Sequence, residues 1–107
     1  MKKSSRRSAD KRLTRGSGNV FVDLGFDEAE ARVMAMRAEL MIKIAEQMKS
    51  RGWTQAEAAR RLHVTQPRIS KLSKGVWQDF SVDMLLALAT RAGLHTELHV
   101  EKARQAA

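Results

Sequence analysis

The sequence predicts a mainly α-helical fold, a bundle of four to five helices followed by one C-terminal β-strand. Three observations support this class. Residues that cap helices precede the apolar segments, Gly residues follow most of them, and apolar side chains recur every three or four positions from residue 28 to residue 92. Only residues 94–101 change to a period of two, which is typical of a half-buried strand.

Basic residues are concentrated in two regions of the chain, whose formal net charge is +8. Residues 1–18 hold seven Lys or Arg against one Asp, and residues 54–75 hold five against one Glu. Because neutralised phosphates release counterions, such regions favour a polyanionic partner. An acidic protein would satisfy the charge nearly as well.

The composition also excludes several classes of protein. The chain has no Cys, so it forms neither disulfides nor a thiolate metal site, which suits a reducing cytoplasm. No apolar run is long enough to cross a membrane, and the charged N-terminus lacks the apolar core of a secretory signal. We therefore expect a cytoplasmic protein without a membrane partner.

The composition divides the chain into three parts. Residues 1–19 are rich in Lys, Arg, Ser and Gly and have almost nothing to bury, so we expect a flexible basic tail. Residues 20–101 are expected to form the one folded domain, and residues 102–107 a flexible C-terminus. At the start of the domain, the apolar segment Val20–Leu24, ended by Gly25, is interpreted as extended chain.

A long helix is expected over residues 28–51. Asp27 and Glu30 have the spacing of a capping box, and neither Gly nor Pro occurs again until Gly52. Apolar residues at steps of three or four predict one buried stripe. The stripe comprises Val33, Met36, Leu40, Ile44 and Met48, widened by Met34, Met41 and Ile42.

Residues 54–75 predict two short helices joined by a tight turn. Thr54 and Glu57 form a second capping-box pattern at the first helix. Thr65 caps the second helix, Pro67 stands in its first turn, and Gly75 ends it. The apolar residues that would fix the crossing are Ala58, Ala59, Leu62, Val64, Ile69 and Leu72. This is a helix-turn-helix, a motif that places its second helix in the major groove of DNA.

The outer face of this second helix predicts the DNA contacts. At about 100° per residue the face is polar and free of acidic residues. It holds the candidate base readers Gln66, Pro67, Ser70, Lys71 and Lys74. Gln can pair with adenine, Lys can reach the acceptors of guanine, and Pro can touch a thymine methyl. The candidates for DNA backbone contacts are Thr54, Gln55 and Thr65 at helix N-termini, and Arg68 at the edge of the face.

A last helix and a strand complete the prediction. Phe80 anchors the loop before a helix over about residues 82–92, which Ser81 caps and Gly93 closes. Its inward residues are Leu85, Leu88, Ala89 and Ala92. In the strand, Leu94, Thr96, Leu98 and Val100 alternate with His95, Glu97, His99 and Glu101. A lone strand needs a pairing edge, which Val20–Leu24 or the same strand of a second copy offers, so we expect a homodimer.

The sequence argues against an enzyme. His95 and His99 are four residues apart, but on a strand that spacing separates them by roughly 13 Å. No Ser/His/Asp set, Gly-rich phosphate loop or carboxylate pair stands in an evident cleft. We expect no catalytic residues, cofactor or metal, and no small-molecule ligand is evident from the sequence.

The helix-turn-helix resembles that of the Cro and phage-repressor-like (XRE-type) family. The family pattern, Thr-Gln-x-x-x-Ala…Val-x-Gln-x-x-Ile-Ser…Gly, is met by Thr54, Gln55, Ala59, Val64, Gln66, Ile69, Ser70 and Gly75. The resemblance implies a lambda-repressor-like helix-turn-helix bundle and a sequence-specific DNA-binding transcriptional repressor. His63 departs from the pattern, because the family usually has Gly there in a left-handed conformation. We expect His63 to adopt that conformation with a small strain.

The wider frame from Gly18 to about Val100 is similar to HigA-like antitoxins of type II toxin–antitoxin modules. The segment GNVFVDLGF ahead of the long helix and the strand after the last helix carry this resemblance. It implies that residues 20–101 are a DNA-binding and dimerisation domain, and that the homodimer represses its own operon from a palindromic operator in the bacterial cytoplasm. It also implies a HigB/RelE-like ribonuclease toxin as partner. The alternative is a free-standing phage- or restriction-control-type regulator without a toxin partner.

Overall fold

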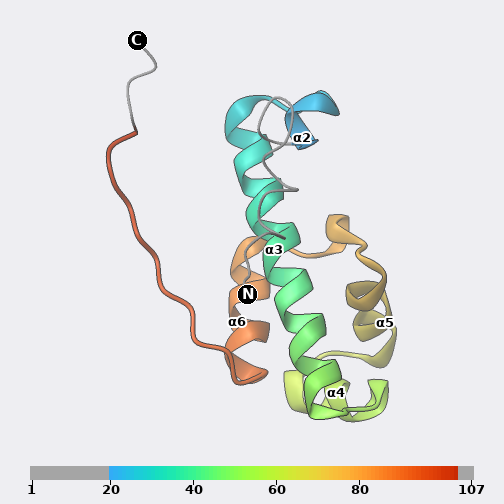
Figure 1. Cartoon of the computed structure of the whole chain (residues 1–107). Coiled ribbons are helices and arrows are strands. Elements are labelled where there is room, and N and C mark those ends of the chain that lie inside the picture. Colours follow the sequence, from blue (N-terminus) through green and yellow to red (C-terminus); the bar gives the residue numbers. More distant parts are fainter. Residues whose placement is uncertain (1–19, 104–107) are drawn as a thin grey trace.

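The computed structural model describes residues 20–103 (Figure 1). In chain order its elements are α2 Val20–Asp23, α3 Glu28–Arg51, α4 Gln55–Leu62, α5 Gln66–Lys74, the 3₁₀ helix η1 Trp77–Asp79 and α6 Val82–Arg91. The flexible tail expected over residues 1–19 lies outside the described residues, as do residues 104–107 of the expected flexible C-terminus. The mainly helical class is confirmed, whereas no strand occurs between residues 20 and 103.

The long helix α3 supports the other helices. Its predicted capping box is complete, because Glu30 N donates to Asp27 Oδ1 at 2.7 Å and Asp27 N donates to Glu30 Oε1 at 3.2 Å. Gly52 ends the helix in the left-handed conformation, with φ 70°. Figure 1 shows α6 along one side of α3, α5 along the other, and α4 across the C-terminal end of α3.

One apolar core joins α3 to α4, α5 and α6. Its buried residues are Met41, Ile44, Met48, Ala58, Ala59, Leu62, Ile69, Leu72, Phe80, Leu85, Leu88, Ala89 and Ala92. The residues predicted to fix the helix-turn-helix crossing and the inward face of the last helix all belong to this core or, as for Val64, pack against it. Since burial of each large apolar side chain contributes about 1.5–3 kcal/mol, this cluster fixes how α5 is presented.

The segment Val20–Asp23 is helical, so the extended conformation predicted for Val20–Leu24 is wrong. Leu24 N donates to Val20 O at 3.1 Å, and Gly25 follows with φ 104°. The helix places the Phe21 ring edge-on against Phe26 and Trp77, with ring centroids 6.1 and 6.4 Å apart. A short apolar run does not reveal its period, so tertiary packing decides its conformation.

The buried stripe of α3 is rotated from the predicted one in the N-terminal half of the helix. Val33, Met36 and Ile42 are 40%, 50% and 50% exposed. Ala31 is buried instead, because this part of α3 packs against Phe21 of α2. The predicted residues that the cores bury fully or in part are Met34, Leu40, Met41, Ile44 and Met48.

The predicted C-terminal strand is not formed in this chain. Residues 94–103 leave α6 as extended chain that runs away from the bundle (Figure 1). Leu94 packs against the core, but Leu98 and Val100 are each 84% exposed. A strand requires a neighbour for its N–H and C=O groups, and because α2 is helical, the edge expected at Val20–Leu24 does not exist.

Candidate nucleic-acid interface

The turn between α4 and α5 has the geometry of a helix-turn-helix. His63 ends α4 in the left-handed conformation, with φ 62° and ψ 42°, as predicted for this position. Thr65 begins α5, and its Oγ1 accepts a hydrogen bond from Arg68 N at 3.4 Å. Pro67 lies in the first turn, where no N–H is required. The start of α5 is therefore fixed by its own sequence.

The last helix also holds this turn. Arg91 of α6 donates from Nη1 to the carbonyl oxygen of Leu62 at 3.2 Å, which satisfies an acceptor left free at the end of α4. At the same end of α6, Gln47 Nε2 of α3 donates to Ala92 O at 3.0 Å. Because these bonds tie α6 to both α3 and α4, the helix-turn-helix is presented on a rigid support.

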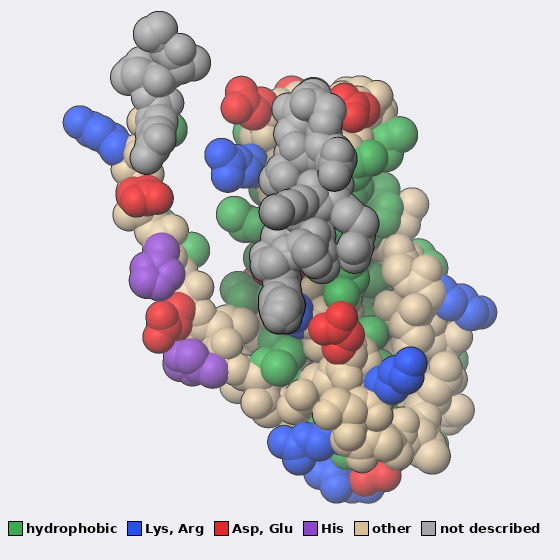
Figure 2. Space-filling model, viewed as in Figure 1, with side chains coloured by type: hydrophobic (Ala, Val, Ile, Leu, Met, Phe, Trp, Pro, Cys, Tyr) green, Lys and Arg blue, Asp and Glu red, His purple; other side chains and the backbone are tan. Residues whose placement is uncertain are grey.

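The outer face of α5 is open to solvent, as predicted. Ile69 and Leu72 point into the core. The predicted base readers that are exposed are Gln66, Pro67, Lys71 and Lys74, with Ser70 half-buried. Figure 2 shows Lys and Arg side chains around α4 and along the side of the molecule formed by α5. The structure therefore brings the five predicted base readers to one helix surface.

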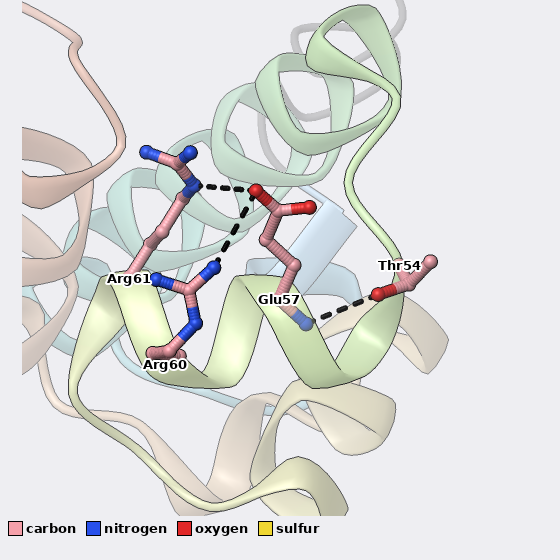
Figure 3. A network of polar contacts seen from close by, with 4 residues as sticks. All are labelled: Thr54, Glu57, Arg60 and Arg61. Atoms are coloured by element: carbon pink, nitrogen blue, oxygen red, sulfur yellow. Dashed lines mark hydrogen bonds and ion pairs between the residues drawn. The ribbon is translucent and has the colours of Figure 1, made fainter.

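The threonines that cap the two helices keep a hydrogen-bond donor. Thr54 Oγ1 accepts from Glu57 N at 3.1 Å (Figure 3), as Thr65 does at the start of α5. Since each hydroxyl oxygen is used as an acceptor, its O–H can still donate to a phosphate oxygen. Gln55 is exposed in the first turn of α4. All three side chains are therefore exposed at the N-termini of α4 and α5.

The carboxylate of Glu57 does not complete the second predicted capping box. It accepts instead from Arg61 Nε at 2.9 Å and lies 3.6 Å from Arg60 Nη2, as Figure 3 shows. The guanidinium of Arg61 also lies over the ring of Trp53, 5.0 Å from its centroid. Two of the basic charges of α4 are therefore partly neutralised within the domain.

Arg68 is held inside the domain. Its Nη1 donates to Asp79 O at 3.0 Å and contacts Met84 Sδ at 3.4 Å. Its guanidinium lies over the Phe80 ring, 5.6 Å from the centroid. These interactions engage the Nη1 donor and one face of the guanidinium, so the observed role of Arg68 is to join α5 to the loop before α6. The predicted role at the edge of the DNA face stays a prediction.

An acidic residue reaches the surface that was predicted to be free of acid. Asp79 Oδ2 lies 2.9 Å from Lys71 Nζ. The hydrogen bond and positive charge of Lys71, together with the charge of Arg68, hold the pKa of the Asp79 carboxyl below its usual value. Helical periodicity could not reveal this contact, because Asp79 belongs to η1 and not to α5. The sole sequence signal was Gly75, which turns the chain back with φ 78°.

The described part of the chain shows two further absences. Between residues 20 and 103 there is no group of three or more His, Asp or Glu side chains that could hold a metal ion. Nor does any helix in that range have the length and apolar character needed to cross a membrane.

Comparisons with known proteins agree with this geometry. A family model described as a helix-turn-helix domain matches residues 20–101. A solved structure described as an XRE family transcriptional regulator is similar with a TM-score of 0.67 and 24% sequence identity, over 73% of this chain and 88% of that chain. This likeness shows a shared fold, whereas no curated protein matches the chain. Since the family model covers the motif and the helices that support it, the chain belongs to the helix-turn-helix domain family.

Proposed function

We propose that this protein is a sequence-specific DNA-binding transcriptional repressor that inserts α5 into the major groove. The observation that carries the proposal is the polar outer face of α5, which projects from a helix whose inner residues Ile69 and Leu72 are buried. A rigid helix with exposed polar side chains near its N-terminus is what major-groove recognition requires.

Each exposed side chain has a proposed partner on DNA. Gln66 pairs with the N6 and N7 atoms of adenine, and Lys71 and Lys74 reach the O6 and N7 acceptors of guanine. Pro67 contacts a thymine methyl, while Ser70 can donate to or accept from a base edge. Thr54, Gln55 and Thr65 bind phosphate oxygens, which fixes the register of the helix without reading sequence.

The repressor is proposed to act as a homodimer on a palindromic operator in the bacterial cytoplasm. Two copies related by a twofold axis would place their α5 helices about one turn of DNA, roughly 34 Å, apart. The unpaired C-terminal segment supports a second copy, because residues 94–103 leave the bundle without a partner strand among the described residues.

We further propose a protein partner, as the resemblance to HigA-like antitoxins implies. The observation that favours it is an apolar surface on the N-terminal half of α3, where Val33 and Met36 are exposed. Beside them lies a depression of about 310 Å³ lined by Phe26, Ala29, Glu30, Val33 and Met34. DNA binding by α5 has no use for this surface, whereas an apolar patch with a hollow suits a protein contact. The proposed occupant is a HigB/RelE-like ribonuclease toxin.

Two measurements test these proposals separately. The DNA upstream of the protein's own gene should bind at least tenfold more tightly than a shuffled duplex of equal length, and equal affinity would contradict the repressor. The product of the neighbouring gene should form a complex that Met36→Glu weakens and the control Glu39→Gln leaves intact. No complex, and no rescue of growth from that product, would contradict the antitoxin role and leave a free-standing phage- or restriction-control-type regulator.

A further inference from the structure

The C-terminal segment carries His and Glu side chains on one side. His95 Nε2 lies 3.1 Å from Glu97 Oε2, and His99 Nε2 lies 3.4 Å from Glu97 Oε1. Contacts between residues two apart require their side chains to share one side of an extended chain. Figure 2 shows His and Glu side chains alternating along this segment, which projects from the bundle. One side of the segment is therefore a row of His and Glu.

The other side of the segment is apolar and unpaired. Leu98 and Val100 are each 84% exposed, and Thr96 lies between Leu94 and Leu98 in the same alternation. Leu94 N donates to Ala89 O, whereas residues 95–103 form no backbone hydrogen bond with any other part of the chain that the structure describes. Extended chain with free N–H and C=O groups is a template for pairing with another strand.

A second copy of the same segment fits this edge in one register better than in its neighbours. In an antiparallel pair centred on Leu98, His95 faces Glu101 and Glu97 faces His99, and the twofold axis repeats both pairs. Centring on Glu97 places that carboxylate opposite itself, which is unfavourable because like charges face each other, and it leaves neither His opposite a Glu. A shift of the register by one residue would pair odd-numbered with even-numbered residues, which places the His–Glu side of one strand against the apolar side of the other.

Two neighbouring registers, centred on Thr96 and on Val100, also place a His opposite a Glu, but they are weaker. Centring the pair on Thr96 keeps His95 opposite Glu97 but drives residue 101 towards residue 91, which belongs to α6. Centring it on Val100 keeps His99 opposite Glu101 and loses the pairs of His95 and Glu97. Both registers retain half of the His–Glu pairs found around Leu98.

We propose that residues 94–102 of two copies form an antiparallel two-stranded ribbon in which Leu98 lies opposite itself. The inference rests on the homodimer of the proposed function and specifies its contact. The His–Glu row sets the register, and Leu98 with the Thr96–Val100 pairs forms the apolar side. Leu94 fastens each strand to its own core, which matters because an isolated two-stranded ribbon is only marginally stable.

Single cysteines test the register, since the chain has no Cys of its own. In the proposed ribbon the two Cα atoms at position 98 lie within disulfide range, about 4.4–6.8 Å. The two atoms at position 96 are offset by four residues, roughly 13 Å. Leu98→Cys should therefore give a covalent dimer on oxidation, and Thr96→Cys, the matched control, should not. A mixture of Thr96→Cys and Val100→Cys should cross-link as a heterodimer.

The His–Glu row is tested by exchanging the charges at positions 97 and 99. Glu97→Lys should weaken the dimer by about tenfold in sedimentation equilibrium, and Glu97→Lys combined with His99→Glu should restore it. Equal cross-linking of Leu98→Cys and Thr96→Cys, or a wild-type dimer in which Leu98→Cys does not cross-link, would overturn the ribbon. A wild-type protein that stays monomeric at 100 µM would also overturn it. Wild-type binding to the upstream DNA, measured in parallel, shows whether the repressor proposal stands or fails separately.

Discussion

Lys71 Nζ lies 2.9 Å from Asp79 Oδ2, so a proposed base-reading cation is paired with a carboxylate on the same surface. The side chains are 55% and 34% exposed, and an exposed ion pair of this kind contributes little to stability. A carboxylate close to DNA nevertheless repels phosphates and competes for the lysine. The pair therefore favours specificity, because it lowers the affinity for DNA of unrelated sequence, which depends on phosphate contacts.

Replacing Asp79 should strengthen binding to unrelated DNA. Asp79→Asn frees Lys71 for a phosphate, so the slope of log affinity against log salt should become steeper by about one. Fluorescence anisotropy with a shuffled duplex at several salt concentrations measures it. Asp83→Asn is the matched control, since Asp83 bonds to the Ser81 hydroxyl and not to a lysine. Equal slopes for both variants would contradict a role for the pair.

The same pair predicts a pH dependence of stability. Lys71 holds the pKa of Asp79 below its ordinary value of 3.8, so the ionised carboxylate stabilises the folded state. That contribution is complete above the ordinary pKa and is lost as the pH falls through the lowered one. The melting temperature of wild type should exceed that of Asp79→Asn at pH 7, and the gap should close as the pH falls below 3.8 and through the lowered pKa of Asp79. If the difference in melting temperature widened as the pH fell, the ionised carboxylate of Asp79 would not be the form that stabilises the folded state.

Arg68 should matter for stability more than an exposed arginine of the same motif. Arg68→Ala removes the hydrogen bond to Asp79 O and the contact with Phe80, so we expect a loss of about 1–3 kcal/mol. Arg60 is the control, because its side chain is 70% exposed and Arg60→Ala should change stability by less than about 1 kcal/mol. Urea unfolding measures both losses. Equal losses of stability in the two variants would show that the contacts of Arg68 do not stabilise the fold.

His63 should be replaceable by glycine with a gain in stability. A non-glycine residue in the left-handed conformation is strained by about 1–2 kcal/mol, while glycine adds entropy to the unfolded chain. We expect His63→Gly to stabilise the protein by up to about 1 kcal/mol and His63→Val to destabilise it, because a β-branched residue tolerates this conformation poorly. A destabilised His63→Gly in thermal unfolding would indicate that His63 makes a contact worth more than its strain.

Caps and periodicity predicted the helices that present the candidate site. Asp27, Thr54, Thr65 and Ser81 each begin a helix at the expected position, because a capping hydrogen bond is local in sequence. The buried faces of α4, α5 and α6 could be predicted from the spacing of their apolar residues, because each of these short helices packs against a single core and therefore buries only one side.

Contacts between distant segments could not be predicted in the same way. Val33 and Met36 fit a helical stripe as well as Ala31 does, and the packing of Phe21 decides between them. Asp79 meets Lys71 only because of the turn after α5. The C-terminal residues alternate as a strand does, but the alternation says nothing about whether a pairing edge exists within the same chain.

The most direct test of the account is whether α5 reads bases. Affinities for the upstream DNA and for a shuffled duplex should be compared for wild type, Gln66→Ala and Lys43→Ala, an exposed α3 cation outside the motif. We predict that Gln66→Ala lowers the preference for the upstream DNA by about 1–3 kcal/mol, while Lys43→Ala leaves it unchanged. An unaltered preference in Gln66→Ala would contradict the assignment of α5 as the reading helix.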